Sequence, residues 1–189
     1  MSIKSILIAG IAAASLTGGL AMAQQGPPPG CADIEHFNDF DFWVGNWNVY
    51  GPNGQLGGTN IITKRHSDCL IMEEWTNTAG TGGTSMNFFD PSINQWRQVW
   101  MSANTFIDYT GGPNDDGAMA LEGTITNFGP NGQTSAPFRG VWTLNEDGSV
   151  TQHFTQFDAD NDVWNDWFIG TYVRMENDPN APQDAASED

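Results

Sequence analysis

The sequence predicts an all-β protein, a single antiparallel up-and-down barrel of about ten strands. Clusters of Gly, Asn, Asp and Pro recur at short, fairly even intervals, which is typical of hairpin turns. The segments between these clusters are rich in Trp, Phe, Val, Ile and Thr, the residues that strands prefer. No segment between the two ends of the chain has the apolar periodicity of a helix.

The expected elements alternate along the chain as strand and turn. Strands are expected at 42–50, 56–66, 69–78, 84–90, 95–102, 105–110, 117–127, 136–144, 149–157 and 163–175. Glycine- and asparagine-rich turns are expected at 51–54, 81–83, 90–92, 111–113, 129–132, 145–148 and 158–161. Such a chain can form a sandwich of two sheets or a barrel, and closure into a barrel leaves no exposed edge. A barrel wider than about eight strands encloses more space than side chains readily fill, so we expect a ligand cavity.

The chain begins with the pattern of a cleavable secretory signal peptide. Lys4 precedes an apolar stretch from Ile6 to Ala14, and Ala21-Met22-Ala23 resembles a cleavage site. The apolar stretch is too short to span a bilayer, so we expect cleavage and export to the periplasm or the exterior, without membrane insertion. The predicted regions are a signal peptide (1–23), a flexible lead (24–36), a barrel domain (37–175) and a disordered acidic tail (176–189).

The chain is strongly acidic. Its formal net charge is −17, and loss of Lys4 with the signal peptide would make the mature charge −18. Such a surface repels nucleic acid and anionic lipid, so neither is an expected partner. The acidic residues are interpreted as a solvated surface that keeps the protein soluble.

Cys31 and Cys69 are the two cysteines of the chain. In an exported protein they are expected to pair, and closing this loop would stabilise the fold by about 3–4 kcal/mol in the chain-entropy model. Two buried free thiols are the alternative. Neither cysteine has a plausible catalytic partner, and two cysteines alone do not form a zinc site.

The first and last expected strands carry a family resemblance. The first contains Phe40-Asp41-Phe42-Trp43 followed by Gly45-Asn46-Trp47, and the last ends in Arg174. This pattern resembles the calycins, that is the lipocalins and their relatives, and among them exported bacterial proteins with a lipocalin-like domain. The resemblance covers roughly residues 37–174. It implies a calycin barrel in which Gly45, Trp47 and Arg174 are structural residues, the cation packing across the indole where the barrel closes.

Two expected strands alternate aromatic and amide side chains. Trp96, Gln98 and Trp100 share one face of segment 95–102, and Gln152 and Phe154 share one face of segment 149–157. Aromatic area with a few polar groups is typical of a ligand cavity. The same pattern also fits core packing with the amides satisfied locally, so both interpretations are open.

Glu73 and Glu74 are adjacent on segment 69–78, so one of them points inward whichever face is buried. A buried Glu beside Trp75 has the raised pKa of a general acid or of an anchor for a polar ligand. Arg139 is the cation expected to neutralise it. An internal ion pair that fixes strand order is the structural alternative.

Three functions are compatible with these observations. The preferred one is binding of a small, largely apolar molecule in the barrel interior, and the predicted ligand-binding residues are Glu73, Trp75, Trp96, Gln98, Trp100, Arg139, Trp142, Gln152 and Phe154. The second is a lumenal isomerase or hydratase that uses Glu73 or Glu74. The third is an envelope protein with a filled barrel that acts through its outer surface. No HExxH, CxxC or phosphate-binding loop is present, and neither a metal nor a cofactor is expected.

Overall fold

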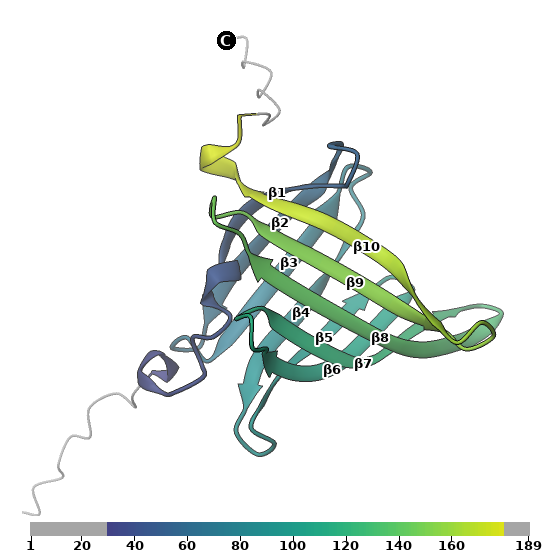
Figure 1. The fold of residues 1–189 in the computed structure, drawn as a ribbon, viewed down its shortest axis with the longest axis horizontal. Helices are drawn as coiled ribbons and strands as arrows, with labels where there is room; N and C mark the ends of the chain where they lie inside the picture. Colours follow the sequence, from purple (N-terminus) through teal and green to yellow (C-terminus); the bar gives the residue numbers. More distant parts are fainter. Residues whose placement is uncertain (1–29, 180–189) are drawn as a thin grey trace, which may run out of the picture.

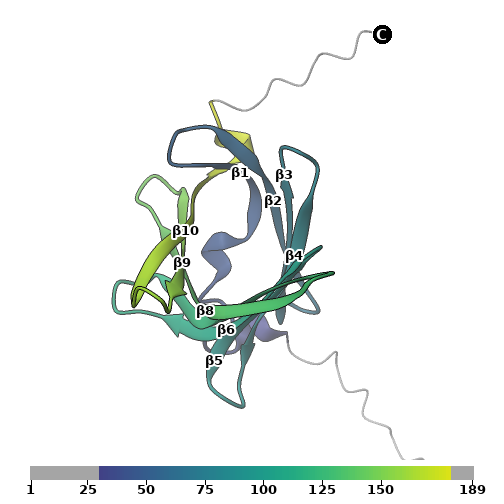
Figure 2. The ribbon, with the colours of Figure 1, turned by 90° about the vertical axis from the view of Figure 1, so that its right-hand side faces the viewer.

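Ten antiparallel strands form a closed barrel in the computed structural model, which describes residues 30–179 (Figures 1 and 2). The strands are β1 (Gly45–Tyr50), β2 (Leu56–Arg65), β3 (Leu70–Asn77), β4 (Gly82–Asp90), β5 (Gln95–Ser102), β6 (Thr105–Pro113), β7 (Met119–Gly129), β8 (Gly132–Leu144), β9 (Val150–Asp158) and β10 (Val163–Arg174). Each strand pairs with the next one in sequence, and β1 also pairs with β10. The predicted fold class is therefore confirmed, and the architecture matches a calycin-like barrel.

The helical content of the described residues is limited to three 3-10 turns, η1 (Cys31–Asp33), η2 (Asp41–Trp43) and η3 (Met175–Asn177). The first strand was expected to begin at residue 42, but η2 occupies that position and β1 begins at Gly45. The turn places Phe40 and Trp43 inside the barrel, which a straight strand would not do. The predicted signal peptide, residues 24–29 of the lead and residues 180–189 of the tail lie outside the described residues.

The N-terminal segment closes one end of the barrel. Figure 2 looks along the barrel, and η2 lies within the ring of strands. Phe40 stacks on Trp43 with ring centroids 4.9 Å apart, and its ring edge contacts Trp96 and Trp142. Phe40, Trp43 and Trp142 are completely buried. We call this the closed end, and the opposite end, where the β3–β4, β5–β6 and β9–β10 turns lie, the open end.

The residues of the calycin-like pattern meet where β1 pairs with β10. Arg174 lies opposite Trp47 in the strand register, and its guanidinium carbon is 4.3 Å from the centroid of the Trp47 ring. The Trp47 indole N–H donates to the Trp43 carbonyl at 2.9 Å. Gly45 has a φ of +151°, and a Cβ there would collide with the Arg174 guanidinium. Glycine at this position is therefore required by both the backbone and the cation.

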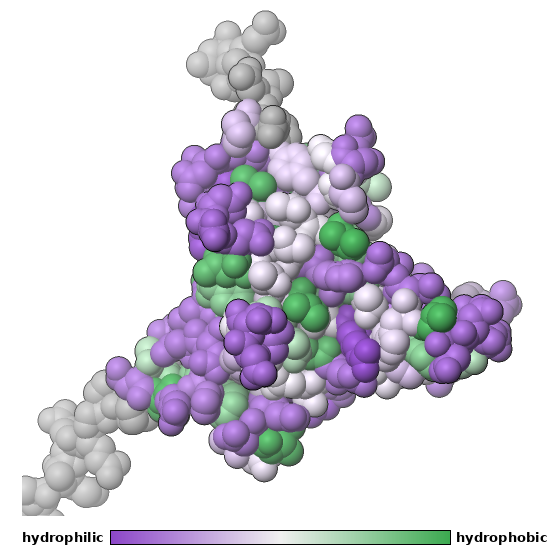
Figure 3. Space-filling view, viewed as in Figure 1, coloured by the Kyte–Doolittle hydropathy of each residue, from purple (hydrophilic) through white to green (hydrophobic). Residues whose placement is uncertain are grey.

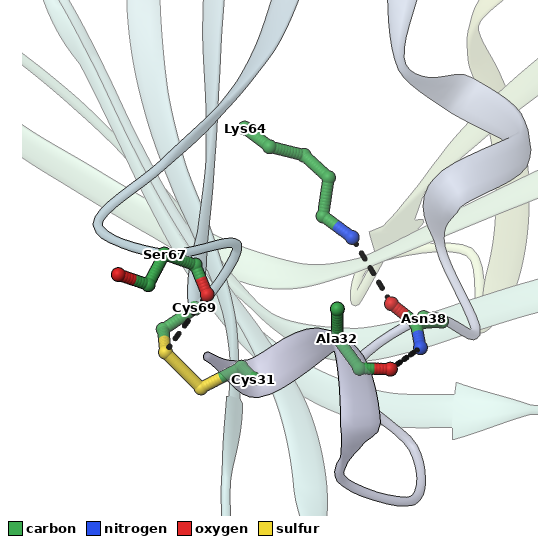
Figure 4. The surroundings of a disulfide bond; sticks show 6 residues. All are labelled: Cys31, Ala32, Asn38, Lys64, Ser67 and Cys69. Carbon is green, nitrogen blue, oxygen red and sulfur yellow. Dashed lines mark hydrogen bonds between the residues drawn. A yellow bond between two sulfur atoms is a disulfide. The ribbon is translucent and has the colours of Figure 1, made fainter. Parts of the chain in front are cut away.

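A disulfide fastens the N-terminal segment to the barrel (Figure 4). Cys31 of η1 is bonded to Cys69 in the β2–β3 turn, and the Cys31 amide donates to the Ser67 carbonyl at 2.8 Å. Lys64 reinforces this end because its ammonium group lies 2.7 Å from the Asp41 carboxylate. The predicted disulfide is confirmed, and it indicates an oxidising, extracellular type of compartment.

One face of the outer surface is predominantly polar (Figure 3). On the face shown in Figure 3, hydrophilic residues cover most of the area and hydrophobic residues are scattered among them. Within residues 30–179 there is no helix with the length and hydropathy needed to cross a membrane. The burial pattern of most strands alternates, as expected for a barrel with one face inward.

Candidate functional site

A cavity of about 270 Å³ lies inside the barrel toward the open end. Its lining comes from β3, β5, β6, β9 and β10 and consists of Glu73, Trp75, Asn77, Gln98, Trp100, Ile107, Tyr109, Gln152, Phe154, Trp167, Phe168 and Tyr172. A cavity of roughly 150 Å³ with apolar walls accommodates a benzene molecule. The space here therefore suits a compound of one or two rings.

Tryptophan and phenylalanine form the walls of the cavity. Trp75 follows Glu73 by two positions on β3, and Trp100 follows Gln98 by two positions on β5, so both point inward. On β10 a bulge between Asp166 and Phe168 turns Trp167 toward the mouth. Aromatic rings therefore line the cavity near the open end.

Polar side chains form the floor, with the Glu73 carboxyl at their centre. Ser85 donates to one Glu73 oxygen at 2.5 Å, and Asn60 donates to the other at 2.7 Å. Asn60 also lies 3.2 Å from the Tyr172 hydroxyl, and Tyr172 donates to Gln152 at 2.6 Å. These groups are 4% exposed or less, so they form a buried polar network beneath the cavity.

A second arm of the network reaches Glu73 through Ser85. The Tyr109 hydroxyl donates to the Gln98 carbonyl oxygen, and the Gln98 amide donates to the Asn87 side-chain oxygen. Asn87 donates in turn to the Ser85 hydroxyl at 2.8 Å. Every donation in this arm runs toward the Glu73 carboxyl, which is the final acceptor.

The environment shifts the pKa values of three groups at the floor. Burial raises the pKa of Glu73 from 4.5 to about 7, although the hydrogen bonds from Ser85 and Asn60 act in the opposite direction. Burial, reinforced by the charge of Glu73, raises the pKa of Tyr109 and of Tyr172 well above 10. The tyrosines therefore remain protonated at neutral pH, whereas Glu73 titrates there.

Arg139 does not neutralise Glu73, contrary to the expectation from the sequence. Its side chain is on the outer face, where it donates to Glu122 at 2.8 Å and lies 3.8 Å from the Trp164 ring centroid. The two residues are far apart in strand order, because Glu73 is on β3 and Arg139 is on β8. Glu74 is also exposed on the outer face.

None of the five Lys and Arg residues within 30–179 lines the cavity. Lys64 pairs with Asp41 at the closed end, Arg97 pairs with Asp108, and Arg174 covers Trp47. Glu73 makes no ion pair with a described residue. Its carboxyl group is therefore surrounded by neutral hydrogen-bond donors.

The other predicted ligand-binding residues separate into two groups. Lining the cavity are Glu73, Trp75, Gln98, Trp100, Gln152 and Phe154. Trp96 and Trp142 are instead buried at the closed end against Phe40. The indole N–H of Trp96 donates to the His36 carbonyl at 3.1 Å, so this residue helps to fasten the N-terminal segment.

Several residues of the site were not predicted. Ser85, Asn87 and Phe89 occupy every second position of β4 and share its inward face, so the period-two pattern of that segment marked an inward face with polar residues. Asn60, Tyr109 and Tyr172 sit at comparable inward positions of β2, β6 and β10. Trp167 had no such signal because the bulge changes which way it points.

No group of three or more His, Cys, Asp and Glu side chains in residues 30–179 is arranged to hold a metal ion. A scan against protein-family models finds no match for the chain, and a search of curated proteins finds no relative. Function is therefore inferred from the geometry and chemistry of the cavity.

Proposed function

We propose that this protein binds a small, largely apolar molecule in the barrel cavity. The observation that carries the proposal is the cavity of about 270 Å³ with aromatic walls and a polar floor. Aromatic walls supply apolar area, and a few polar groups fix the orientation of a ligand. A barrel filled by side chains would favour a role for the outer surface, and this cavity argues for the interior instead.

The proposal includes an exported, calycin-like carrier. The resemblance on β1 and β10, the closed barrel and the Cys31–Cys69 disulfide support it. We infer that residues 1–23 are removed and that the mature domain works in the periplasm or outside the cell. The ligand would then be a compound that is present in that compartment.

Native mass spectrometry of protein purified from its host tests the proposal directly, with a retained small molecule as the expected result. Trp100→Leu removes an aromatic wall and should weaken binding of that molecule by about tenfold or more. Trp164→Leu is the matched control, because Trp164 packs on Phe157 and Arg139 outside the cavity. Absence of a retained mass, together with unchanged tryptophan fluorescence across a panel of lipids and pigments, would contradict the proposal.

A lumenal isomerase or hydratase is the second candidate, and Glu73 favours it. Its carboxyl lines the cavity and has a pKa of about 7, which suits proton transfer at neutral pH. Glu74 has no such position because it is exposed. Incubating the retained compound with the wild type and with Glu73→Gln, followed by mass spectrometry, separates the two candidates: an enzyme converts the compound only when Glu73 is present.

A further inference from the structure

The most unusual feature of the cavity is a buried carboxyl group with no cation. Glu73 is 4% exposed, and within residues 30–179 its oxygens accept hydrogen bonds only from the neutral side chains of Ser85 and Asn60. A buried carboxylate is costly unless a positive charge accompanies it. No lysine or arginine of the described part of the chain lines the cavity, so the barrel wall does not supply that charge.

We propose that the ligand carries a protonated amine, whose ammonium group pairs with Glu73 while its apolar body lies between the tryptophans. This inference rests on the proposed function and names the class of ligand, a small compound with an aromatic body and an amine. The ammonium would complete the charge balance of Glu73. It would also be a further donor to a group that is already the final acceptor of the network.

The strand register places an indole in the same row as the carboxyl, with β4 between them. Glu73 pairs with Ser85, and Ser85 pairs with Trp100, so the three residues occupy one row across β3, β4 and β5. A Cβ on Gly83 would collide with the six-membered ring of Trp100, which means that the indole lies over this glycine. The Trp100 ring also lines the cavity, and an indole attracts a cation that approaches its face.

The direction of the hydrogen bonds also favours a ligand that donates a hydrogen bond to Glu73. Tyr109, Gln98, Asn87 and Ser85 form a chain of donations that ends on Glu73, and Asn60 donates from the other side. A ligand that contributes a positive donor fits this pattern. A ligand carboxylate does not, because it would be repelled by Glu73 and would meet no cation in the cavity.

The overall charge of the protein also favours a cationic ligand. The chain has a formal net charge of −17, which raises the local concentration of cations and lowers that of anions near the protein. Both the long-range field and the cavity floor therefore favour an amine over a fatty acid of similar size.

Isothermal titration calorimetry with matched ligand triplets tests the inference. Each triplet shares one skeleton (phenyl, indolyl or naphthyl) and ends in an ethylamine, an ethanol or an acetate group. For at least one skeleton we expect the amine to bind about 10- to 100-fold more tightly than the alcohol, as for a charge-assisted hydrogen bond, and the acetate not to bind. Glu73→Gln should remove this preference, so that the amine and the alcohol of one skeleton bind the variant with affinities within about threefold of each other. Glu74→Gln, which removes the neighbouring charge from the outer face, should preserve it.

The outcomes distinguish this inference from the proposed function. If alcohols bind as tightly as amines, or acetates bind best, the ligand class is wrong and the binding function stands. If none of the nine compounds binds the wild type, the ligand class is contradicted, and the proposed function is decided separately by the native mass spectrometry and the fluorescence panel. Thermal unfolding of each variant shows whether a loss of binding reflects a loss of the fold.

A measurement on the unmodified protein tests the same pairing if Glu73→Gln does not fold. Burial raises the pKa of Glu73 to about 7, so an amine that pairs with the carboxylate must displace a proton below that pH. The groups facing Glu73 that also titrate are Tyr109 and Tyr172, and both remain protonated there. We expect amine affinity to fall by up to about tenfold per pH unit below 7, and the displaced proton to be taken up by the buffer. An affinity that stays constant from pH 8 down to pH 3, below the ordinary pKa of a glutamate, would overturn the inference.

Discussion

The two ends of the barrel use the same residue types for different purposes. Strand β5 contributes Trp96 to the closed end and Trp100 to the open end, from the same inward face. Phe40 and Trp43 pack against the closed-end indoles, so Trp96 is only 2% exposed, whereas Trp100 is partly buried and lines the cavity. An inward tryptophan thus becomes core or cavity wall according to whether another segment covers it.

The closed end should contribute more to stability than the open end. Phe40→Ala removes a completely buried ring that contacts Trp43, Trp96 and Trp142, and it should lower the free energy of unfolding by about 3–5 kcal/mol. Trp100→Ala removes a partly buried ring beside an existing cavity and should cost less than half as much. Urea denaturation measures both values. Equal losses would mean that the two ends are equally packed.

The disulfide should matter for the closed end alone. Cys31 and Cys69 are separated by 38 residues, and the double variant Cys31→Ala/Cys69→Ala should lower the free energy of unfolding by about 3–4 kcal/mol. Ligand affinity at the open end should remain unchanged below the unfolding transition, because neither cysteine lines the cavity. Titration calorimetry at a temperature where the variant is folded measures this affinity. Weaker ligand binding by the variant would show that the two ends are coupled.

Glu73 should make the open end sensitive to pH. The pKa of this carboxyl is raised by burial from 4.5 to about 7, so the folded state binds the proton more tightly than the unfolded state between these values. Its contribution to stability is therefore complete below pH 4.5 and is lost as the pH rises to about 7, by about 3 kcal/mol. The difference in unfolding free energy between Glu73→Gln and the wild type should increase over this window.

The paired control for this prediction is Glu74→Gln, which carries the same change on the outer face. It should shift stability by a similar small amount at every pH. A Glu73→Gln difference that stays constant from pH 4.5 to 7 would show that the carboxyl ionises normally in the folded protein.

The sequence allowed the fold to be predicted because its signals are local. Turn residues and the alternation of apolar side chains depend on neighbours in the chain, and the ten strands of the described residues follow the predicted order. Gly45 and Trp47 marked the strand that meets Arg174 at the closure. What the sequence did not indicate was η2, because its turn depends on how Phe40 and Trp43 pack inside the finished barrel.

The site was only partly predictable for a related reason. Alternation correctly grouped Gln98 with Trp100 and Glu73 with Trp75, since these pairs share one strand face. It did not tell how deep a residue lies along the barrel, so Trp96 and Trp142 were assigned to the cavity although they belong to the closed end. Arg139 was paired with Glu73 on charge alone, whereas the register places it opposite Glu122.

Trp167 offers the finest test of the difference between the two ends. It is 48% exposed at the β10 bulge and contacts Phe138 and Phe154 at ring-centroid distances of 5.4 and 6.1 Å. Trp167→Ala should therefore cost about 1 kcal/mol or less in unfolding free energy, as for loss of an exposed aromatic contact. Because the ring stands at the mouth of the cavity, the same change should accelerate ligand release several-fold in stopped-flow dissociation. Trp164→Ala, on the outer face of the same strand, should leave the release rate unchanged, and an equal effect of both variants would place the exit of the ligand elsewhere.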